Sequence, residues 1–351
     1  MSTLRPCRVR LLLILSLFTL LLVAGCREGG NMSAGETGGL RKLSVQLNWF
    51  PEPEFGGLYA ALENGHFRAA GLDVELIKGG ADVPAGQLVA SGNTEVAVVS
   101  AAQLATLRAR GGRATAVFAS FQKAPRSVIV RADSDLKTLK SVWEAKGRIM
   151  ADSGLPWVRW LTSKYGPTGL SFVPYGGSLA PFISKDVTAM QAFATAEPVQ
   201  LEADKVPTRV FLVADTGYDP YDVVLAVHDD LLTSEPVVVE AFTRALASGW
   251  KDYLANPAAT NAVIKRLNPD FSARTLELAA ARLPAFVQSE DTASHRLGWM
   301  TAERWNTLLD QLVTIGELDS SERAKVGTIF LNPGSAPISK DSPSSAGSSA
   351  G

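Results

Sequence analysis

The chain has 351 residues, with 34 Lys and Arg, 35 Asp and Glu, and two cysteines. Its first 25 residues contain three arginines and no acidic side chain, so the remainder has 31 basic and 35 acidic residues, a net charge of −4. This balance excludes the basic surface that nucleic-acid-binding proteins present. Cys7 lies in the first 25 residues, so Cys26 is left without a cysteine partner in the remainder and cannot form a disulfide bond there.

The first 26 residues have the pattern of a secretory signal. Three arginines, at positions 5, 8 and 10, precede an apolar run of 14 residues that begins at Leu11. This run is shorter than the roughly 20 residues that span a bilayer. It ends in VAGC, which resembles the lipobox of bacterial lipoproteins, so we expect residues 1–25 to be removed and Cys26 to carry a lipid anchor. An ordinary signal that happens to precede a cysteine is the alternative.

Two segments poor in apolar residues flank the main body of the chain. Residues 26–42 are rich in Gly and Ser and predict a flexible tether, and residues 333–351, rich in Pro, Ser and Gly, predict a disordered tail. The 290 residues between them suit two lobes better than one core. Beyond the signal, no apolar stretch approaches membrane-spanning length.

The first part of this body alternates short apolar runs with longer helical patterns, which is typical of parallel sheets covered by helices. Strands are predicted at 43–49, 72–77, 96–99 and 114–121, and helices at 57–70, 84–90 and 102–110. The continuous apolar run 96–99 indicates a strand that is buried on both faces. These elements predict one α/β lobe.

The pattern then restarts and predicts a second, smaller lobe. Strands are expected at 127–131, 148–151, 170–174, 189–194 and 209–214, and helices at 139–145, 156–165, 179–183 and after Pro198. A strand at 223–227 would cross back, and the rest is mainly helical, with helices at 237–250, 276–286 and 302–315. The predicted fold is therefore a two-lobed α/β clamshell, each lobe a mostly parallel sheet flanked by helices, with lobe 1 at 43–126 and 225–332 and lobe 2 at 127–224.

A resemblance to a known family follows from LNWFPEPEFGGLYAALENGHFRAAGLDVEL at 47–76, together with FQKAP at 121–125, YGGS at 175–178, TAEP at 195–198 and DTGYDPYDVVLAV at 215–227. In their order and spacing these motifs resemble the periplasmic binding proteins related to binders of the thiamine pyrimidine precursor, whose wider group includes sulfonate- and nitrate-binding proteins of ABC importers. The resemblance covers the chain from Leu43 to about Val287 and implies a type II periplasmic-binding-protein fold. One departure is Phe55, where pyrimidine-binding members often have a histidine.

The ends of the predicted strands supply the candidate ligand contacts, because open parallel sheets bind ligands outside the carboxyl ends of their strands. In the first lobe, Trp49 and Phe55 would stack on a planar ligand, or Trp49 would serve the core or hinge. Ser100 and Gln122 end two further strands and would either hydrogen-bond the ligand or cap the following turn.

The second lobe offers three candidate segments. Asp152 and Ser153 precede a predicted helix whose N–H groups would favour an anion, unless Asp152 itself caps them. Tyr175, Gly176 and Gly177 allow stacking and close backbone approach, or form a plain tight turn. Glu197 would accept hydrogen bonds from a ligand, as the resemblance implies, or act as a helix N-terminal residue. The motifs also place Tyr59, Tyr218 and Tyr221 among the expected contacts.

The functional prediction is a solute-binding protein of an ABC importer, anchored outside the cytoplasm by the lipid on Cys26. We expect a small planar heteroaromatic or anionic ligand, a permease and an ATPase as partners, no cofactor, and a monomer. Catalysis is disfavoured, because the three histidines are scattered and the pyrimidine-synthase relatives use a cysteine cluster that this chain lacks. A ligand sensor for a signalling partner, or a pyrimidine-biosynthesis enzyme, are the alternatives.

Overall fold

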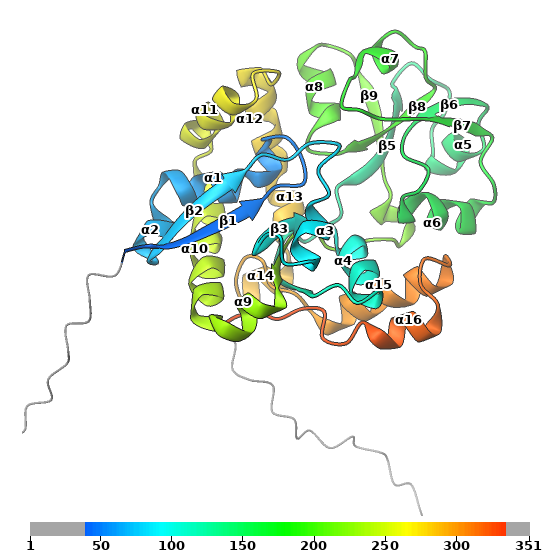
Figure 1. Cartoon of the computed structure of the whole chain (residues 1–351). Coiled ribbons are helices and arrows are strands. Elements are labelled where there is room, and N and C mark those ends of the chain that lie inside the picture. Colours follow the sequence, from blue (N-terminus) through cyan, green and yellow to red (C-terminus); the bar gives the residue numbers. More distant parts are fainter. Residues whose placement is uncertain (1–38, 335–351) are drawn as a thin grey trace, which may run out of the picture. The chain divides into compact units, whose positions relative to one another are not determined.

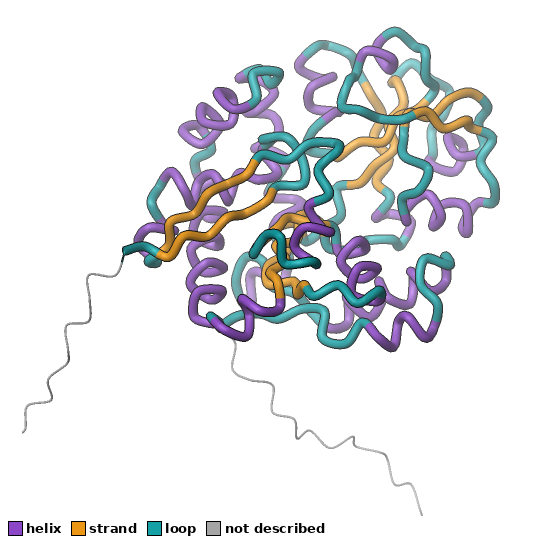
Figure 2. The backbone as a smooth tube through the Cα atoms, in the orientation of Figure 1, coloured by secondary structure: helices purple, strands orange, loops and turns teal. Residues whose placement is uncertain are grey.

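Two separate β-sheets organise the chain (Figures 1 and 2). The computed structural model describes residues 39–334, and from Leu40 onward the chain belongs to one compact unit. The predicted signal, the lipidation site Cys26 and all but the first two residues of the predicted tail lie outside the described residues.

The first sheet has five strands, of which three run parallel side by side and a fourth is inserted antiparallel. In spatial order the strands are β2 (Leu72–Ile77), β1 (Arg41–Gln46), β3 (Val96–Val99), β10 (Asp222–His228) and β4 (Ala114–Phe121). All residues of β3, β10 and the edge strand β4 are buried, as expected for a sheet covered on both faces.

The second sheet repeats this plan. Its strands are β7 (Leu170–Val173), β6 (Gly147–Met150), β8 (Ala189–Phe193), β5 (Arg126–Arg131) and β9 (Thr208–Leu212). Strand β5 runs antiparallel to both of its neighbours, while β6 is parallel to β7 and β8.

The two antiparallel strands mark the places where the chain passes between the sheets. Strand β4 leads directly to β5, and β9 leads through the 3-10 turn η2 (Ala214–Thr216) back to β10. The predicted two-lobed α/β fold is confirmed. Strand β10 begins at Asp222, so its first residues pair with β4 although the sequence analysis counted them with the second lobe.

Helices surround both sheets (Figure 1). The first sheet is accompanied by the 3-10 turn η1 (Pro53–Phe55), α1 (Gly56–Glu63), α2 (His66–Ala69), α3 (Ala85–Ala90), α4 (Ala101–Ala109), α9 (Asp229–Ser234), α10 (Pro236–Ala255), α11 (Ala258–Leu267), α12 (Ala273–Arg282), α13 (Pro284–Val287), α14 (Glu290–Ser294), α15 (Ala302–Thr314) and α16 (Ser320–Lys325). The second has α5 (Leu139–Trp143), α6 (Pro156–Tyr165), α7 (Ala180–Ile183) and α8 (Glu197–Ala203).

Two predicted helices are each divided in the structure. The helix expected at 57–70 is interrupted at Gly65, whose positive φ of 75° is a conformation that glycine adopts readily and other residues rarely do. The helix expected at 276–286 is broken before Pro284, which has no backbone N–H to continue the hydrogen bonding and instead starts α13. Both breaks have local causes.

Close packing between α1 and α10 fixes the segment that follows β1. A Cβ atom added at Gly249 would lie 2.3 Å from the carbonyl oxygen of Gly57, so the two helix backbones touch where neither residue has a side chain. This contact lies close to η1, which immediately precedes α1 and contains Glu54, with Glu52 just before it.

Candidate ligand-binding site

An aromatic pair bridges the two sheets. Trp49 follows β1 in the first sheet and Tyr175 follows β7 in the second, and their ring centroids lie 6.4 Å apart with the planes inclined by 22°. The next turn of the chain also reaches Trp49, because a Cβ atom added at Gly177 would lie 4.0 Å from the indole ring. The predicted residues Trp49, Tyr175 and Gly177 are therefore neighbours, at the carboxyl ends of strands where α/β proteins bind ligands.

Glu197 holds Tyr175 in place. The Tyr175 hydroxyl donates a hydrogen bond of 2.8 Å to Oε1 of Glu197, and the backbone N–H of Phe193 donates one of 2.7 Å to Oε2. Burial raises the pKa of the Glu197 carboxyl, although the hydrogen bond from Tyr175 opposes that rise. The position of Glu197 as the first residue of α8 also gives it a helix-terminal role.

Three further carboxyl groups are buried near Glu197 and act on one another electrostatically. Together with Glu197 they form what we call the carboxyl cluster: Glu52 and Glu54 on either side of Pro53 in the β1–α1 connection, and Asp222 at the start of β10. Their exposed fractions are 7% for Glu52, 6% for Glu54, 9% for Asp222 and 9% for Glu197, so each carboxyl has lost most of its contact with water.

Burial raises the pKa of each member of the carboxyl cluster, and the charges of neighbouring acids raise it further for Glu52 and Glu54. For Glu52 the pKa rises well above its usual range because of burial, then because of Glu54 and Glu197, while the Trp49 indole opposes the rise with a hydrogen bond. Burial, and next the charge of Asp222, raises the pKa of Glu54 to about 8. Burial likewise raises the pKa of Asp222.

One cation faces this group of acids. The charge of Arg126, at the start of β5, lowers the pKa of Glu54, Glu197 and Asp222. Its guanidinium lies 4.4 Å from the centroid of the Phe193 ring, and no salt bridge joins it to an acid among the described residues. Arg282 of α12, the helix packed against η1, is already paired with Glu202 and the carbonyl of Ala194.

Several predicted contacts serve packing instead. Phe55 is fully buried and Tyr59 nearly so, both in the hydrophobic core beneath α1. We therefore assign both rings to the core, because their faces are covered by protein side chains. The same correction applies to Tyr218, which is buried against Trp160, and to Tyr221, which packs on Trp305.

Two predicted polar contacts are occupied by local hydrogen bonds. The Ser100 hydroxyl accepts from the N–H of Gln103 and caps α4. The buried side-chain amide of Gln122 donates to the carbonyls of Ala119 and Trp299. Ser100 therefore has the capping role that the sequence left open, whereas the Gln122 amide binds two carbonyl groups and does not cap the turn that follows it.

At the expected anion site before α6, a side chain of the same segment already accepts a hydrogen bond from the backbone. Asp152 and Ser153 are exposed, and Oδ1 of Asp152 accepts a 2.9 Å hydrogen bond from the N–H of Gly154. The aspartate brings its own negative charge to these donors, which disfavours a second anion there. Gly176 is exposed beside Tyr175.

Sequence reasoning missed Glu52, Glu54, Asp222 and Arg126. The signal for Glu54 is its place in PEPEF, where acids alternate with rigid or apolar residues immediately before an apolar helix. The signal for Asp222 is an acid that heads the apolar strand DVVLAV. Neither pattern reveals burial, which depends on contacts with elements distant in the sequence, such as α12 against η1 and β4 against β10.

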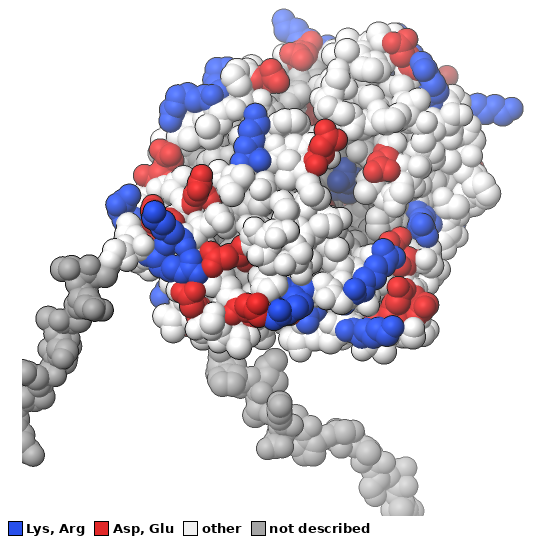
Figure 3. Space-filling model, in the orientation of Figure 1, with Lys and Arg blue, Asp and Glu red and all other residues white. Residues whose placement is uncertain are grey.

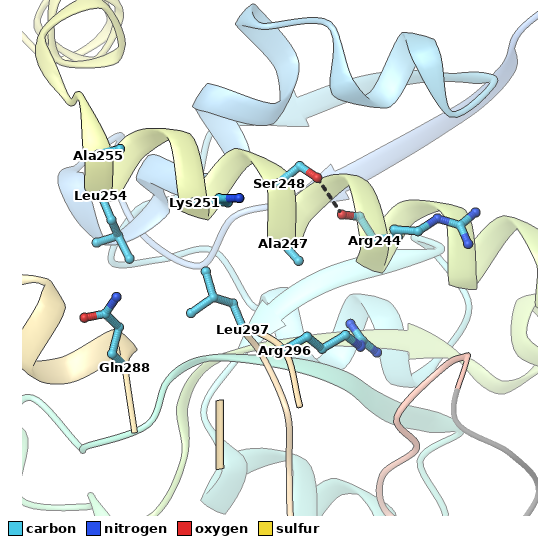
Figure 4. Close-up of a pocket in the computed structure, with 9 residues that line it drawn as sticks. All are labelled: Arg244, Ala247, Ser248, Lys251, Leu254, Ala255, Gln288, Arg296 and Leu297. Carbon is cyan, nitrogen blue, oxygen red and sulfur yellow. Dashed lines mark hydrogen bonds between the residues drawn. The ribbon is translucent and has the colours of Figure 1, made fainter. Parts of the chain in front are cut away.

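A different hollow, of about 630 Å³, has a basic lining and no residue in common with the carboxyl cluster (Figure 4). It is lined by Arg244 and Lys251 of α10 and by Arg296 across from them. On the face drawn in Figure 3, acidic and basic side chains are interspersed, without a continuous field of one sign.

Residues 39–334 contain neither a candidate metal site nor a candidate membrane-spanning helix. No group of three or more His, Cys, Asp or Glu side chains is arranged to hold a metal ion in this part of the chain. No helix in the same range is both long and apolar enough to cross a membrane.

The sequence pattern of the NMT1/THI5-like family matches residues 52–260, more than half of the chain. The chain belongs to this family. It is 22% identical over 282 residues to riboflavin-binding protein RibY of Chloroflexus aurantiacus, covering 76% of this chain and 78% of that protein. It is 21% identical over 306 residues to the formylaminopyrimidine-binding protein of Halalkalibacterium halodurans, covering 84% and 91%.

Family members of another kind match as well. A 4-amino-5-hydroxymethyl-2-methylpyrimidine phosphate synthase of Saccharomyces cerevisiae is 23% identical over 231 residues, covering 62% of this chain and 68% of the synthase. Among solved structures, the alkanesulfonate-binding protein SsuA of Xanthomonas axonopodis pv. citri bound to MOPS has a TM-score of 0.63 at 12% identity, covering 84% of this chain and all of SsuA. A Candida albicans protein with the generic periplasmic-binding-protein fold has a TM-score of 0.58 at 17% identity, covering 84% and 97%. The fold is thus that of periplasmic binding proteins.

The raised pKa of Glu54 predicts a pH-dependent stability. The folded protein keeps this proton up to about pH 8, whereas the unfolded chain loses it near pH 4.3, so the free energy of unfolding should fall as the pH rises between these values. Urea denaturation at several pH values should show this slope in the wild type and a smaller one in Glu54→Gln. The exposed Glu63→Gln on α1 is the control and should keep the slope. Equal slopes in all three proteins would contradict the assignment.

Proposed function

We propose that this protein is the extracytoplasmic solute-binding component of an ABC importer and that it captures a small planar molecule where the two sheets meet. The observation that carries the proposal is the Trp49–Tyr175 pair, which joins the two sheets through aromatic faces at the carboxyl ends of strands. Aromatic faces stack on planar ligands and bury apolar area. Two relatives are named for riboflavin and formylaminopyrimidine, both planar nitrogen heterocycles.

Glu197 would fix the orientation of the stacked ligand through a hydrogen bond. Its carboxyl already accepts hydrogen bonds from Tyr175 and from Phe193, so its orientation is set before a ligand arrives. A ring N–H or exocyclic amino group would gain a charge-assisted hydrogen bond to the same carboxyl. Pre-organisation of this kind lowers the entropic cost of binding.

Capture would proceed by movement of the lobes about the two connections between the sheets, at 122–125 and 213–221. Trp49 belongs to one side and Tyr175 to the other, so a ring placed between them contacts both only when the lobes are shut. Ligand contacts made in the shut state alone shift the equilibrium toward closure. The closed monomer would then present its ligand to a permease, whose ATPase partner drives import.

An enzymatic role is the second candidate, because synthases are among the relatives. The chain has cysteines at positions 7 and 26, and both lie outside the described residues. The cysteine cluster expected of the synthase relatives therefore has no counterpart in residues 39–334. We favour binding without catalysis. A sensor module would use the same site and differs only in its partner.

Replacement of Trp49 should weaken ligand binding. Loss of a stacked aromatic ring costs about 1 to 3 kcal/mol, so Trp49→Ala should reduce affinity by roughly 5- to 150-fold. Isothermal titration with riboflavin, formylaminopyrimidine and MOPS, the ligands named for the relatives, would identify a ligand that binds the wild type and measure this loss. Trp299→Ala is the matched control, because that indole is partly exposed and stacks on His295 instead. Undiminished affinity in Trp49→Ala would refute the site.

Lipidation of Cys26 predicts membrane attachment. Cys26→Ala should leave the protein unlipidated and soluble after cell lysis, because the lipidated cysteine would supply the apolar anchor of the mature chain. Detergent partitioning and globomycin-sensitive processing of the wild type are the readouts. A Cys26→Ala protein that stays in the membrane fraction after a high-salt wash would contradict the anchor.

A further inference from the structure

The proposed site contains more acidic side chains than basic ones. The carboxyl cluster contains four acids, and the cation whose charge acts on them is Arg126, which forms no salt bridge among the described residues. Buried acids normally have hydrogen-bond donors or ionic partners, because an unpaired buried charge is costly. The members of the cluster differ in how far this requirement is met.

Glu54 is the member without a donor. Glu197 receives two hydrogen bonds, Glu52 receives the Trp49 indole N–H, and Asp222 receives the backbone N–H of Val223. No hydrogen bond or salt bridge reaches the Glu54 carboxyl from any residue in 39–334, although only 6% of the residue is exposed. Its oxygens are not among the fully enclosed atoms without a partner in residues 39–334, so the carboxyl is open to a ligand that supplies donors.

A second hydrogen-bond acceptor, the side-chain oxygen of Asn48, also lacks a donor. Asn48 lies at the end of β1 and immediately precedes Trp49. Its side-chain oxygen Oδ1 is buried and accepts no hydrogen bond within the described part of the chain. An amide oxygen outside the carboxyl cluster therefore also lacks a donor, in the residue that precedes Trp49 in the sequence.

We propose that the ligand captured at this site is a planar molecule bearing a positively charged, donor-rich nitrogen group, of the amidinium or ammonium type, which pairs with Glu54 and its neighbouring acids. This inference rests on the proposed function and specifies its ligand class. Glu54 lacks hydrogen-bond donors and a partner of opposite charge, and a cation of this kind supplies both. A sulfonate or carboxylate supplies neither, because it has no hydrogen-bond donor and carries the same sign of charge as an ionised acid.

The protonation of the empty site is consistent with this ligand class. Burial and the charges of Asp222 and Glu197 raise the pKa of Glu54 against the opposing effect of Arg126, so the empty protein carries a proton there at neutral pH. A bound cation would replace that proton as the neutralising charge. Binding should then release protons, and calorimetry in buffers of different ionisation enthalpy measures that release.

Three probes with one ring and different charge test the inference: benzamidine as the cation, benzamide as the neutral analogue and benzenesulfonate as the anion. Titration of the wild-type protein should rank benzamidine first, benzamide second and benzenesulfonate last. Glu54→Gln should lose about 10- to 140-fold in benzamidine affinity, the worth of a hydrogen bond to a charged group. It should leave benzamide binding nearly unchanged, and the exposed Glu63→Gln should bind all three probes like the wild type.

The outcomes separate this inference from the proposed function. Equal or stronger binding of benzenesulfonate by the wild type would overturn the cationic ligand and leave solute capture standing. Equal loss of benzamidine and benzamide binding in Glu54→Gln would also overturn it, because the variant would then have lost shape and not charge recognition. Binding of none of the three probes would contradict the inference and the proposed function together. The order of affinities for the three probes is measured on the wild-type protein, so this part of the test does not depend on whether Glu54→Gln folds.

Discussion

The burial of Glu54 without a hydrogen-bond donor is the constraint around which this site is organised. The turn η1 that carries Glu54 packs against α1 and α12, and only 6% of Glu54 is exposed. Its carboxyl is held beside Asp222 and Glu197, whose charges make ionisation harder. A protein selected for stability alone would place an apolar or exposed residue here. Local conflicts of this type are expected where a protein binds something.

Backbone strain accompanies this electrostatic strain. Val223 follows Asp222 in β10 and has a φ of 48°, an outlier for a β-branched residue. Residues in such conformations persist only where the surrounding structure enforces them, and they are concentrated at binding and switch regions. The strained residue Val223 and its neighbour Asp222, a member of the carboxyl cluster, thus adjoin the connection through which the chain returns to the first sheet. Under our proposal, a cationic ligand would replace the proton on Glu54 as the neutralising charge when the lobes close.

The fold was predictable because the sequence concentrates apolar residues in short runs. Strand β3 has the predicted bounds, Val96–Val99, because the apolar run begins after Glu95 and ends before Ser100. Trp49, Tyr175 and Glu197, which the sequence proposed because each lies at or shortly after the end of a predicted strand, are neighbours in the structure. Phe55 and Tyr59 were misassigned because the sequence does not show which side of a turn a ring faces. Glu54 was missed for the same reason, since an acid between prolines is typical of an exposed loop and its burial depends on contacts distant in the sequence.

The most direct test of the account is the identity of the small molecule that the protein carries. The protein should be purified under native conditions from its own cells, and mass spectrometry should be applied to the molecules that it releases on denaturation. We predict a planar, aromatic compound with a protonated nitrogen group, bound one to one and absent from Trp49→Ala purified in parallel. An anionic, non-aromatic compound that is retained by Trp49→Ala would contradict both the stacking contact and the charge preference on which the account depends.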